Sequence, residues 1–360
     1  MMLNLVGQRL GNYEIISRFG EGGMAAVYKA RQVNIKREVA IKVILPSLAQ
    51  RDEFKKRFDK EAELCASLSH PNIVKIFDYG VARGFHLALT NDSIDARKDV
   101  YFIVMELLTG GSLASKIIRE PLPLSAAVPI IEQIGSALDY AASRGLIHRD
   151  LKPGNVLFDA QGNAILSDFG IARLEGDKQQ ITQDGMAMGT PAYMAPEMWE
   201  EVELTPSLDI YALGVLLYEM LTTKLPFYSR TPYAIMKMHR DDPVPSVSKH
   251  VDGIPPGVDE VIRKAMGKTV EDRYPKAMQM ARDLKKVAAA AETDTVLLEK
   301  SAEAKLSPEL QAERARAVAG KPSSAPKESA STLNPKIILP LIAVGVVVIL
   351  ILLLILAGRG

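Results

Sequence analysis

The stretch His148-Arg149-Asp150-Leu151-Lys152-Pro153-Gly154-Asn155 decides the fold of this 360-residue chain. It is a polar segment between two short apolar runs, residues 145–147 and 156–158. We expect both runs to form buried strands, because a loop held between strands can keep its side chains in fixed positions. Pro153 stiffens the segment further, because its ring restricts the backbone. The stretch therefore has the character of a preorganised site.

The side chains of this loop suit phosphoryl transfer. A carboxylate, an ammonium group and a carboxamide follow one another at spacings of two and three residues. Asp150 would accept a hydroxyl proton, Lys152 would neutralise the moving phosphoryl group, and Asn155 would bind a metal ion. A His-Arg-Asp triplet alone would be weak evidence, because three polar residues in a turn are usually just solvated. The whole string between two apolar runs is much more specific.

The string resembles the catalytic loop of protein kinases. The resemblance extends over about residues 10–285 and implies an α+β, two-lobed protein kinase fold. It places a sheet-rich N-lobe at about 10–106, a hinge near 106–111 and a mostly helical C-lobe at about 111–285, with ATP bound between the lobes. A Gly-Gly-Met sequence at 22–24 resembles the bacterial eukaryotic-like serine/threonine kinases in particular.

Composition excludes several other classes of protein. The chain has 44 basic and 43 acidic residues, so its charge gives no reason to expect nucleic acid as a partner. Cys65 is the single cysteine, which rules out an intrachain disulfide and fits a reducing compartment. The N-terminus lacks a basic region followed by an apolar one, so we expect no secretory signal.

Residues 13–45 alternate apolar and polar positions, which predicts a twisted hairpin leading into a third strand. A glycine-rich stretch lies in this region, and glycine allows the backbone to approach phosphate oxygens closely. A dinucleotide-binding fold is excluded because a strand, not a helix, follows the glycines. The stretch departs from the kinase pattern at Ala25, where the third glycine is expected. The resemblance implies an ATP site formed by Gly20, Glu21, Gly22, Gly23, Val27, Ala40, Lys42, Met105, Glu106, Leu108 and Leu157.

Two charged residues of the N-lobe complete the expected catalytic group. Lys42 ends the apolar run at 39–42, and the resemblance implies that it holds the α- and β-phosphates of ATP. Glu61 lies in residues 52–69, whose apolar positions recur at helical spacing, and the resemblance implies that it pairs with Lys42. The expected catalytic residues are Lys42, Glu61, Asp150 and Lys152. The apolar face of the helix is expected to consist of Phe54, Phe58, Ala62, Cys65 and Leu68.

The hinge and the adenine pocket are expected around residues 101–111. Residues 101–106 read as a buried strand that runs into Gly110 and Gly111. The resemblance places Met105 at the back of the adenine pocket. It also brings the backbone of Glu106 and Leu108 to the edge of the adenine.

A second metal ligand is expected at Asp168, in an Asp-Phe-Gly triplet 13 residues after Asn155. The expected metal is Mg²⁺, with Mn²⁺ as an alternative, held by both side chains and phosphate oxygens. Three regulatory residues follow from the resemblance. Arg149 would receive an activation-loop phosphate, Thr182 would be the autophosphorylation site, and Thr190 would hydrogen-bond Asp150 and Lys152.

Two further residues are expected to hold the C-lobe together. Asp209 begins an apolar helix that reaches about residue 221, where it would cap the helix. The resemblance implies that Asp209 also anchors the backbone of the catalytic loop. It further implies that Arg273 pairs with Glu197 as a structural ion pair.

The C-terminal part predicts a membrane anchor. Residues 337–357 carry no charge and would extend about 31 Å as a helix, enough to span a bilayer. Residues 286–336 read as a flexible juxtamembrane linker, partly helical around 308–319, and 358–360 as a short extracytoplasmic tail. By the positive-inside rule, the charges on either side place the kinase in the cytoplasm of a single-pass cell-membrane protein. Those charges are Arg314, Arg316, Lys321, Lys327 and Lys336 before the span and Arg359 after it.

The expected activity is ATP-dependent phosphorylation of serine and threonine residues in protein substrates. Two alternatives remain: a pseudokinase that acts as a membrane-tethered scaffold or binding module, and a small-molecule kinase of similar fold. All five charged or metal-binding residues of an active kinase are present, which disfavours the first. The closing segment at 189–197 disfavours the second. Homodimerisation through the kinase domain or the membrane helix, the substrate and the activating signal stay open.

Overall fold

The computed structural model divides the chain into two units, Met1–Val296 and Leu297–Gly360. The site discussed below lies in the first unit, and of the second only residues 297–305 are described. The described residues are 5–21, 25–45, 52–86, 97–169, 191–200 and 202–305.

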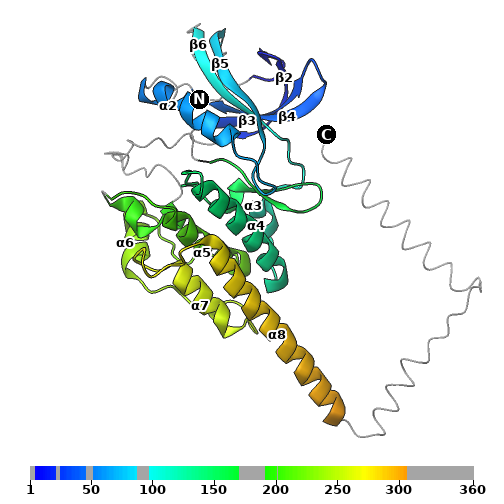
Figure 1. The fold of residues 1–360 in the computed structure, drawn as a ribbon, viewed down its shortest axis with the longest axis vertical. Coiled ribbons are helices and arrows are strands. Elements are labelled where there is room, and N and C mark those ends of the chain that lie inside the picture. The colour runs from blue at the N-terminus through cyan, green and yellow to red at the C-terminus, as the bar shows by residue number, and fades with distance from the viewer. Residues whose placement is uncertain are drawn as a thin grey trace, which may run out of the picture. The chain divides into compact units, whose positions relative to one another are not determined.

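The first unit has the two-lobed arrangement that the sequence predicts. Its N-terminal lobe is built on a six-stranded antiparallel sheet in the order β1-β2-β3-β4-β6-β5. Figure 1 shows the strands at one end of the unit and the helices α3 to α7 at the other. The strands are β1 (Arg9–Leu10), β2 (Tyr13–Glu21), β3 (Ala25–Gln32), β4 (Arg37–Ile44), β5 (Ile76–His86) and β6 (Arg97–Met105).

Alternation along β4 separates two hydrophobic cores. Val39, Ile41 and Val43 contribute to a cluster on the outer face of the sheet. Ala40 and Ile44 belong to the cluster that continues into the C-lobe. Because successive side chains of a strand point to opposite faces, Lys42 lies on the same face as Ala40 and Ile44. The sequence pattern therefore directs Lys42 toward the C-lobe.

Helix α2 (Asp52–Ala66) covers this inner face of the sheet. Its five expected apolar positions are all buried, the last of them, Leu68, just beyond the end of the helix. The rings of Phe54 and Phe58 meet Tyr101 of β6 edge to face at 5.4 and 5.1 Å. The packing fixes the orientation of α2 and so the side on which Glu61 lies.

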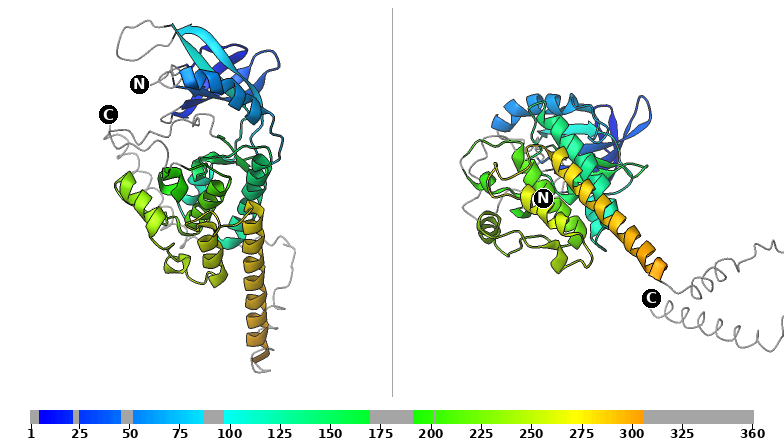
Figure 2. Two further views of the ribbon diagram at one scale, coloured as in Figure 1. Left: turned by 60° about the vertical axis from the view of Figure 1, so that its left-hand side comes forward. Right: turned by 60° about the horizontal axis from the view of Figure 1, so that its bottom comes forward.

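The C-lobe is mostly helical, and α5 (Ser207–Thr222) is its central helix. Fourteen of the helix's residues are buried, including Asp209. Figure 2 shows the other helices of the C-lobe from two further directions. They are α3 (Leu113–Ile117), α4 (Leu124–Ala142), α6 (Pro232–Asp241), α7 (Pro256–Ala265) and α8 (Ala277–Lys305), with the short helices η1 (Pro153–Asn155), η2 (Pro191–Tyr193), η3 (Pro196–Trp199) and η4 (Val247–Lys249) and the hairpin β7 (Val156–Phe158) and β8 (Ala164–Leu166).

The run at 145–147 is not a strand, contrary to the expectation. The N–H groups of Gly145 and Leu146 donate to Ala142 and Ala141 and so end helix α4. Gly145 has a φ of 75°, which favours glycine at this turn. The backbone of these residues is therefore committed to the helix terminus, and the catalytic loop lies between a helix end and strand β7.

Two loops link the lobes, and one of them reaches strand β8, which ends two residues before Asp168. Leu166 in β8 donates to Asn72 at 2.8 Å and accepts from Val74 at 2.9 Å. The amide of Asn72 also donates to Ala164 at 2.9 Å. The connection between α2 and β5 is thus hydrogen-bonded to the residues just before Asp168.

The second connection is the expected hinge at Gly110. Its N–H donates to Phe158 at 2.9 Å, and a Cβ atom at this position would lie 2.5 Å from the carbonyl oxygen of Asp159. Only glycine allows the hinge to lie this close to β7. The hinge therefore rests directly on the hairpin that follows the catalytic loop.

The C-terminal segment differs from the expectation at its start. Residues 286–305, expected as flexible linker, continue helix α8. The reason is an alanine-rich run at 287–291, since alanine favours helix most strongly, and the helix is anchored by the buried Met280, Ala281 and Leu284. Within the described residues no helix is long and apolar enough to cross a membrane. The predicted helix at 308–319, the span at 337–357 and the tail at 358–360 lie outside those residues.

Candidate active site

The catalytic loop is anchored by a buried carboxylate. Asp209 accepts hydrogen bonds from the N–H groups of His148 at 2.7 Å and Arg149 at 2.9 Å. Burial raises the pKa of Asp209, although the two N–H groups and nearby charges oppose this. The anchoring role expected for Asp209 is confirmed. The expected capping role is wrong, because α5 begins at Ser207 and the Asp209 carboxylate is directed at the loop instead.

His148 links this loop to the segment that carries Asp168. Its ring is completely buried, with Nε2 2.8 Å from the carbonyl oxygen of Ser167 and Nδ1 3.3 Å from the N–H of Asp150. A carbonyl only accepts and a backbone N–H only donates, so the hydrogen-bond pattern assigns the proton to Nε2. The same ring meets Phe169 edge to face at 4.8 Å. His148 therefore fixes Asp150 and the Asp-Phe-Gly segment together.

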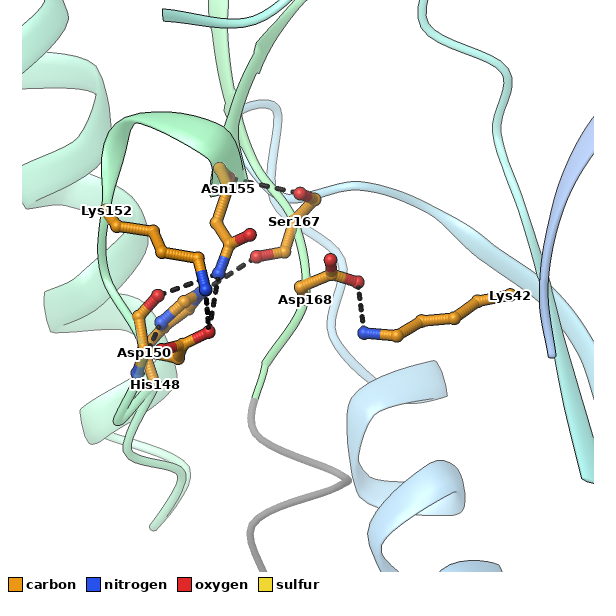
Figure 3. A network of polar contacts seen from close by, with 7 residues as sticks. All are labelled: Lys42, His148, Asp150, Lys152, Asn155, Ser167 and Asp168. Carbon is orange, nitrogen blue, oxygen red and sulfur yellow. Dashed lines mark hydrogen bonds and ion pairs between the residues drawn. The ribbon is translucent and has the colours of Figure 1, made fainter. Parts of the chain in front are cut away.

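The three chemical groups expected in the loop converge on one point. The Nζ atom of Lys152 lies 2.8 Å from Oδ2 of Asp150. The amide nitrogen of Asn155 donates to the carbonyl oxygen of Asp150 at 2.7 Å and to its Oδ2 at 3.1 Å. Figure 3 shows the carboxamide oxygen of Asn155 on the side that faces Asp168. The loop thus positions a base, a cation and an amide oxygen within one hydrogen-bonded group.

Asp168 joins the N-lobe to this group. Its Oδ1 lies 2.8 Å from Nζ of Lys42, and its φ of 63° lies in the left-handed region, unusual for a residue other than glycine. Burial alone would raise the pKa of Asp168, but the charge and hydrogen bond of Lys42 outweigh it and hold that pKa below its ordinary value. Strained backbone of this kind concentrates at functional sites. Asp168 is therefore a carboxylate held ionised between the lobes.

Ser167 was not predicted as a site residue. Its N–H and its hydroxyl both donate to the carbonyl oxygen of Asn155, at 2.9 and 3.1 Å. These bonds place Asn155 and Asp168, the two expected metal ligands, beside each other. No sequence signal identified Ser167, because its role depends on a contact across 12 residues.

The donor set fits Mg²⁺. Mg²⁺ prefers oxygen ligands and usually takes one or two carboxylates from the protein, completing its shell with phosphate oxygens and water. Asp168 offers the oxygen that points away from Lys42, and Asn155 offers the amide oxygen left by its two donated bonds (Figure 3). The described residues hold no group of three or more His, Cys, Asp or Glu suited to a metal ion.

Strand register brings the expected nucleotide contacts onto one face of the sheet. Val27 lies opposite Lys42, and Ala40 lies opposite Met105. Lys42 and Asp168 line a pocket together with Cys65, Ile103, Met105 and Phe169, among others. Gly20 and Glu21 lie in β2 opposite Val27 and Ala26, whereas Gly22 and Gly23 lie outside the described residues.

One hydrogen bond of the hinge limits what the backbone of Glu106 can offer to adenine. The N–H of Glu106 donates to the carbonyl oxygen of Lys75 at 2.9 Å. The backbone of Glu106 can therefore offer only its carbonyl oxygen to adenine. The other expected contact is the backbone of Leu108. Leu157 lies in β7 and pairs with Ser112, just after the hinge, in an isolated bridge.

Glu61 and Lys42 lie around the same buried thiol. Burial and, to a smaller extent, the charge of Glu61 raise the pKa of Cys65 to about 12, and the charge of Lys42 opposes both. Both charges therefore lie near Cys65. Lys42 forms an ion pair with Asp168. Of the expected regulatory residues, Arg149 lies in the catalytic loop with a φ of 63°, and Thr182 and Thr190 lie outside the described residues.

Buried polar contacts fix the described segment that follows Thr190, residues 191–200. Arg273 forms two bonds with Glu197, at 2.6 and 2.7 Å, which confirms the expected ion pair. Tyr193 donates to the carboxylate of Glu219, a contact that the sequence did not indicate. These contacts tie η2 to helix α5 and η3 to Arg273.

Comparisons with known proteins agree with this geometry. The family profile described as protein kinase domain matches residues 13–284. The chain is 38% identical over 283 residues to serine/threonine-protein kinase PrkC of Bacillus subtilis, covering 78% of this chain and 41% of that protein. It is 35% identical over 277 residues to serine/threonine-protein kinase PknB of Mycobacterium leprae, covering 76% and 43%. The chain thus spans about two fifths of the length of these curated relatives.

Solved structures support the fold. A crystal structure of the PknI kinase domain of Mycobacterium tuberculosis matches with a TM-score of 0.61. The match covers 79% of this chain and 98% of that one, at 24% identity. It supports the two-lobed arrangement described above and is too distant to assign individual residues.

Proposed function

The chain belongs to the protein kinase family as a protein serine/threonine kinase, and from this premise we propose that it transfers the γ-phosphate of ATP to serine and threonine residues of other proteins while anchored in a membrane. The observation that carries the proposal is the hydrogen-bonded group of Asp150, Lys152 and Asn155, joined through Ser167 to the ion pair of Asp168 and Lys42 (Figure 3). It brings the charges that phosphoryl transfer requires to one place.

Each residue of this group has a distinct task. Asp150 accepts the proton of the attacking hydroxyl group, and Lys152 beside it neutralises charge on the transferred phosphoryl group. Lys42 holds the α- and β-phosphates. Asp168 and Asn155 would hold Mg²⁺, which neutralises the phosphate charges when bound. Glu61 on α2 and the hinge backbone at Glu106 and Leu108 orient the phosphates and the adenine.

Two rival functions differ from this one in their products. A pseudokinase scaffold would transfer no phosphate, and a small-molecule kinase would phosphorylate a metabolite instead of a protein. The complete set of charged residues and the closing segment at 189–197 support a protein kinase.

The test is to incubate the purified full chain with labelled ATP, Mg²⁺ and either myelin basic protein or a panel of small hydroxyl-bearing metabolites. We expect label on serine and threonine of the protein acceptor and on the chain itself. Transfer confined to the metabolites, or no transfer to either acceptor, would overturn the proposal.

Activation is proposed to involve autophosphorylation at Thr182, with Arg149 as the phosphate's partner. Mapping the modified residues by mass spectrometry should find Thr182, and Thr182→Ala should lower activity. Asp184 nearby would supply part of the negative charge, so the loss is expected to be partial. A fully active Thr182→Ala chain would contradict the assignment.

Membrane anchoring is proposed to rest on residues 337–357, with the kinase domain on the cytoplasmic side. The uncharged length and the excess of basic residues before it support this. We expect the full chain in the membrane fraction and a truncation ending at Pro335 in the soluble fraction. Digestion of the kinase domain by a protease added outside intact cells, or recovery of both proteins as soluble, would contradict it. Two anchored copies could also meet as a dimer for autophosphorylation.

A further inference from the structure

A buried histidine on helix α6 is linked to the central helix of the C-lobe. His239 has no exposed surface, and its Nδ1 lies 2.8 Å from the hydroxyl oxygen of Tyr211 on α5. The ring of Phe227 meets the histidine ring edge to face at 5.0 Å. A buried histidine that takes no part in the phosphoryl-transfer chemistry needs another explanation.

The protonation state of this pair follows from its surroundings. Burial, with the charge of Lys268, lowers the pKa of His239 to about 4, so the ring is neutral at neutral pH. Burial also raises the pKa of Tyr211, which keeps its proton. The phenol therefore donates to Nδ1, and the histidine proton lies on Nε2. That Nε2 is buried and makes no hydrogen bond to the described residues, but the backbone of Ala192 in η2 is close enough to act on it.

The backbone of His239 is held as well as its ring. The Nζ atom of Lys268 lies 2.7 Å from the carbonyl oxygen of His239, and the same ammonium group stacks on the ring of Phe227 at 4.8 Å. Cations near the last carbonyl groups of a helix stabilise its end. His239 is thus fixed at both the side chain and the main chain.

Tyr211 extends the link to the segment below the active site. The guanidinium group of Arg273 lies over the Tyr211 ring at 4.9 Å, and Arg273 is the partner of Glu197 in η3. Helix α6 itself packs against both η2 and η3. The chain of contacts therefore runs from α6 through Tyr211 to the two short helices that follow Thr190.

We propose that His239 is a positioning residue for the protein acceptor: its bond to Tyr211 keeps α6 in contact with η2, so that the segment after Thr190 stays in place beside Asp150. This rests on the proposed function and assigns a determinant of acceptor binding within it. His239 lies outside the catalytic group, so its loss affects the binding of the acceptor and leaves ATP binding unchanged.

The test compares Tyr211→Phe, His239→Phe and His239→Asn in the full chain, with myelin basic protein as the acceptor. Tyr211→Phe and His239→Phe each remove the hydrogen bond and keep an aromatic ring. We expect the KM for the acceptor to rise about five- to tenfold in both, as for the loss of one buried hydrogen bond. The kcat and the KM for ATP should stay within about twofold of the wild type. His239→Asn keeps a hydrogen-bond acceptor near the position of Nδ1, so this variant should retain most of the wild-type affinity for the protein acceptor.

Tyr218→Phe is the matched control, because Tyr218 is a buried tyrosine on the same helix outside this group. A KM for ATP that rises as much as that for the acceptor, or equal losses in the control, would show a merely structural role and overturn the inference. Unchanged acceptor KM in both phenylalanine variants would also overturn it.

A second readout does not need activity. Amide hydrogen exchange over residues 191–199 should be faster in Tyr211→Phe than in the wild type and in the Tyr218→Phe control. If the wild type phosphorylates no acceptor, the proposed function fails, and the exchange data still decide the inference. Unaltered exchange in Tyr211→Phe would then overturn the inference on its own.

Discussion

Replacing Asp168 by Asn is expected to lower the rate of phosphoryl transfer by roughly 10²–10³-fold or more, as for the loss of a single charge-stabilising group in other enzymes. The variant keeps the size of the side chain and removes the charge that pairs with Lys42 at 2.8 Å. It also removes the only carboxylate proposed to hold Mg²⁺. The pKa of Asp168 lies below its ordinary value, so the wild-type group is ionised at every working pH and the loss should not depend on pH.

Steady-state transfer to a protein acceptor measures this effect. Asp241→Asn is the control, since Asp241 is an exposed carboxylate paired with Arg240 on the surface of α6. The control should keep wild-type activity, and both variants should keep the thermal stability of the wild type to within a few degrees. Near-wild-type turnover of Asp168→Asn would remove Asp168 from the mechanism.

Replacing Arg273 by Met is expected to lower the free energy of unfolding by ~3–5 kcal/mol, the cost of leaving one partner of a buried ion pair alone. The side chain of Arg273 has no exposed surface, and that of Glu197 is 10% exposed. Arg273 also donates to the carbonyl oxygens of Gly267 and Ser207. The variant therefore leaves a charge and two acceptors buried without their donor. Urea denaturation measures the change.

The matched control is Lys285→Met, which breaks an ion pair of similar length on the surface. Lys285 lies 2.8 Å from Glu132, and its side chain is 62% exposed. Exposed pairs contribute little, so the free energy of unfolding should change by less than about 1 kcal/mol. Equal losses in the two variants would show that burial does not determine the strength of the Arg273 pair.

The sequence predicted the elements whose pattern is local. Alternation identified β2, β3 and β4, and helical spacing identified the five buried apolar residues of α2 and its immediate end. The catalytic loop was predicted because its chemical groups are close in sequence, and these the structure does bring together. Patterns that are confined to one element are therefore sufficient to predict that element.

The sequence does not predict features that depend on the hydrogen-bond partners of backbone groups. Residues 145–147 are apolar enough for a strand, but the N–H groups of Gly145 and Leu146 end helix α4 instead. The N–H of Glu106 donates to the carbonyl oxygen of Lys75, and no sequence motif indicates this bond. Ser167, His239 and Tyr211 act through contacts with residues distant in sequence, so a single sequence carries no local sign of them. The alanine-rich run after residue 285 has no hydrophobic face, which predicts a linker, but its helix propensity decides its structure.

The most direct test of the central claim is phosphoamino acid analysis of a protein acceptor after incubation with labelled ATP, Mg²⁺ and either the wild-type chain or its Asp150→Asn variant. Asn keeps the size of the residue but cannot accept the hydroxyl proton. We predict phosphoserine and phosphothreonine with the wild type and at least about a hundredfold less of both with the variant. Equal labelling by the two proteins, or label found only on tyrosine, would contradict the assignment of Asp150 as the base of a serine/threonine kinase.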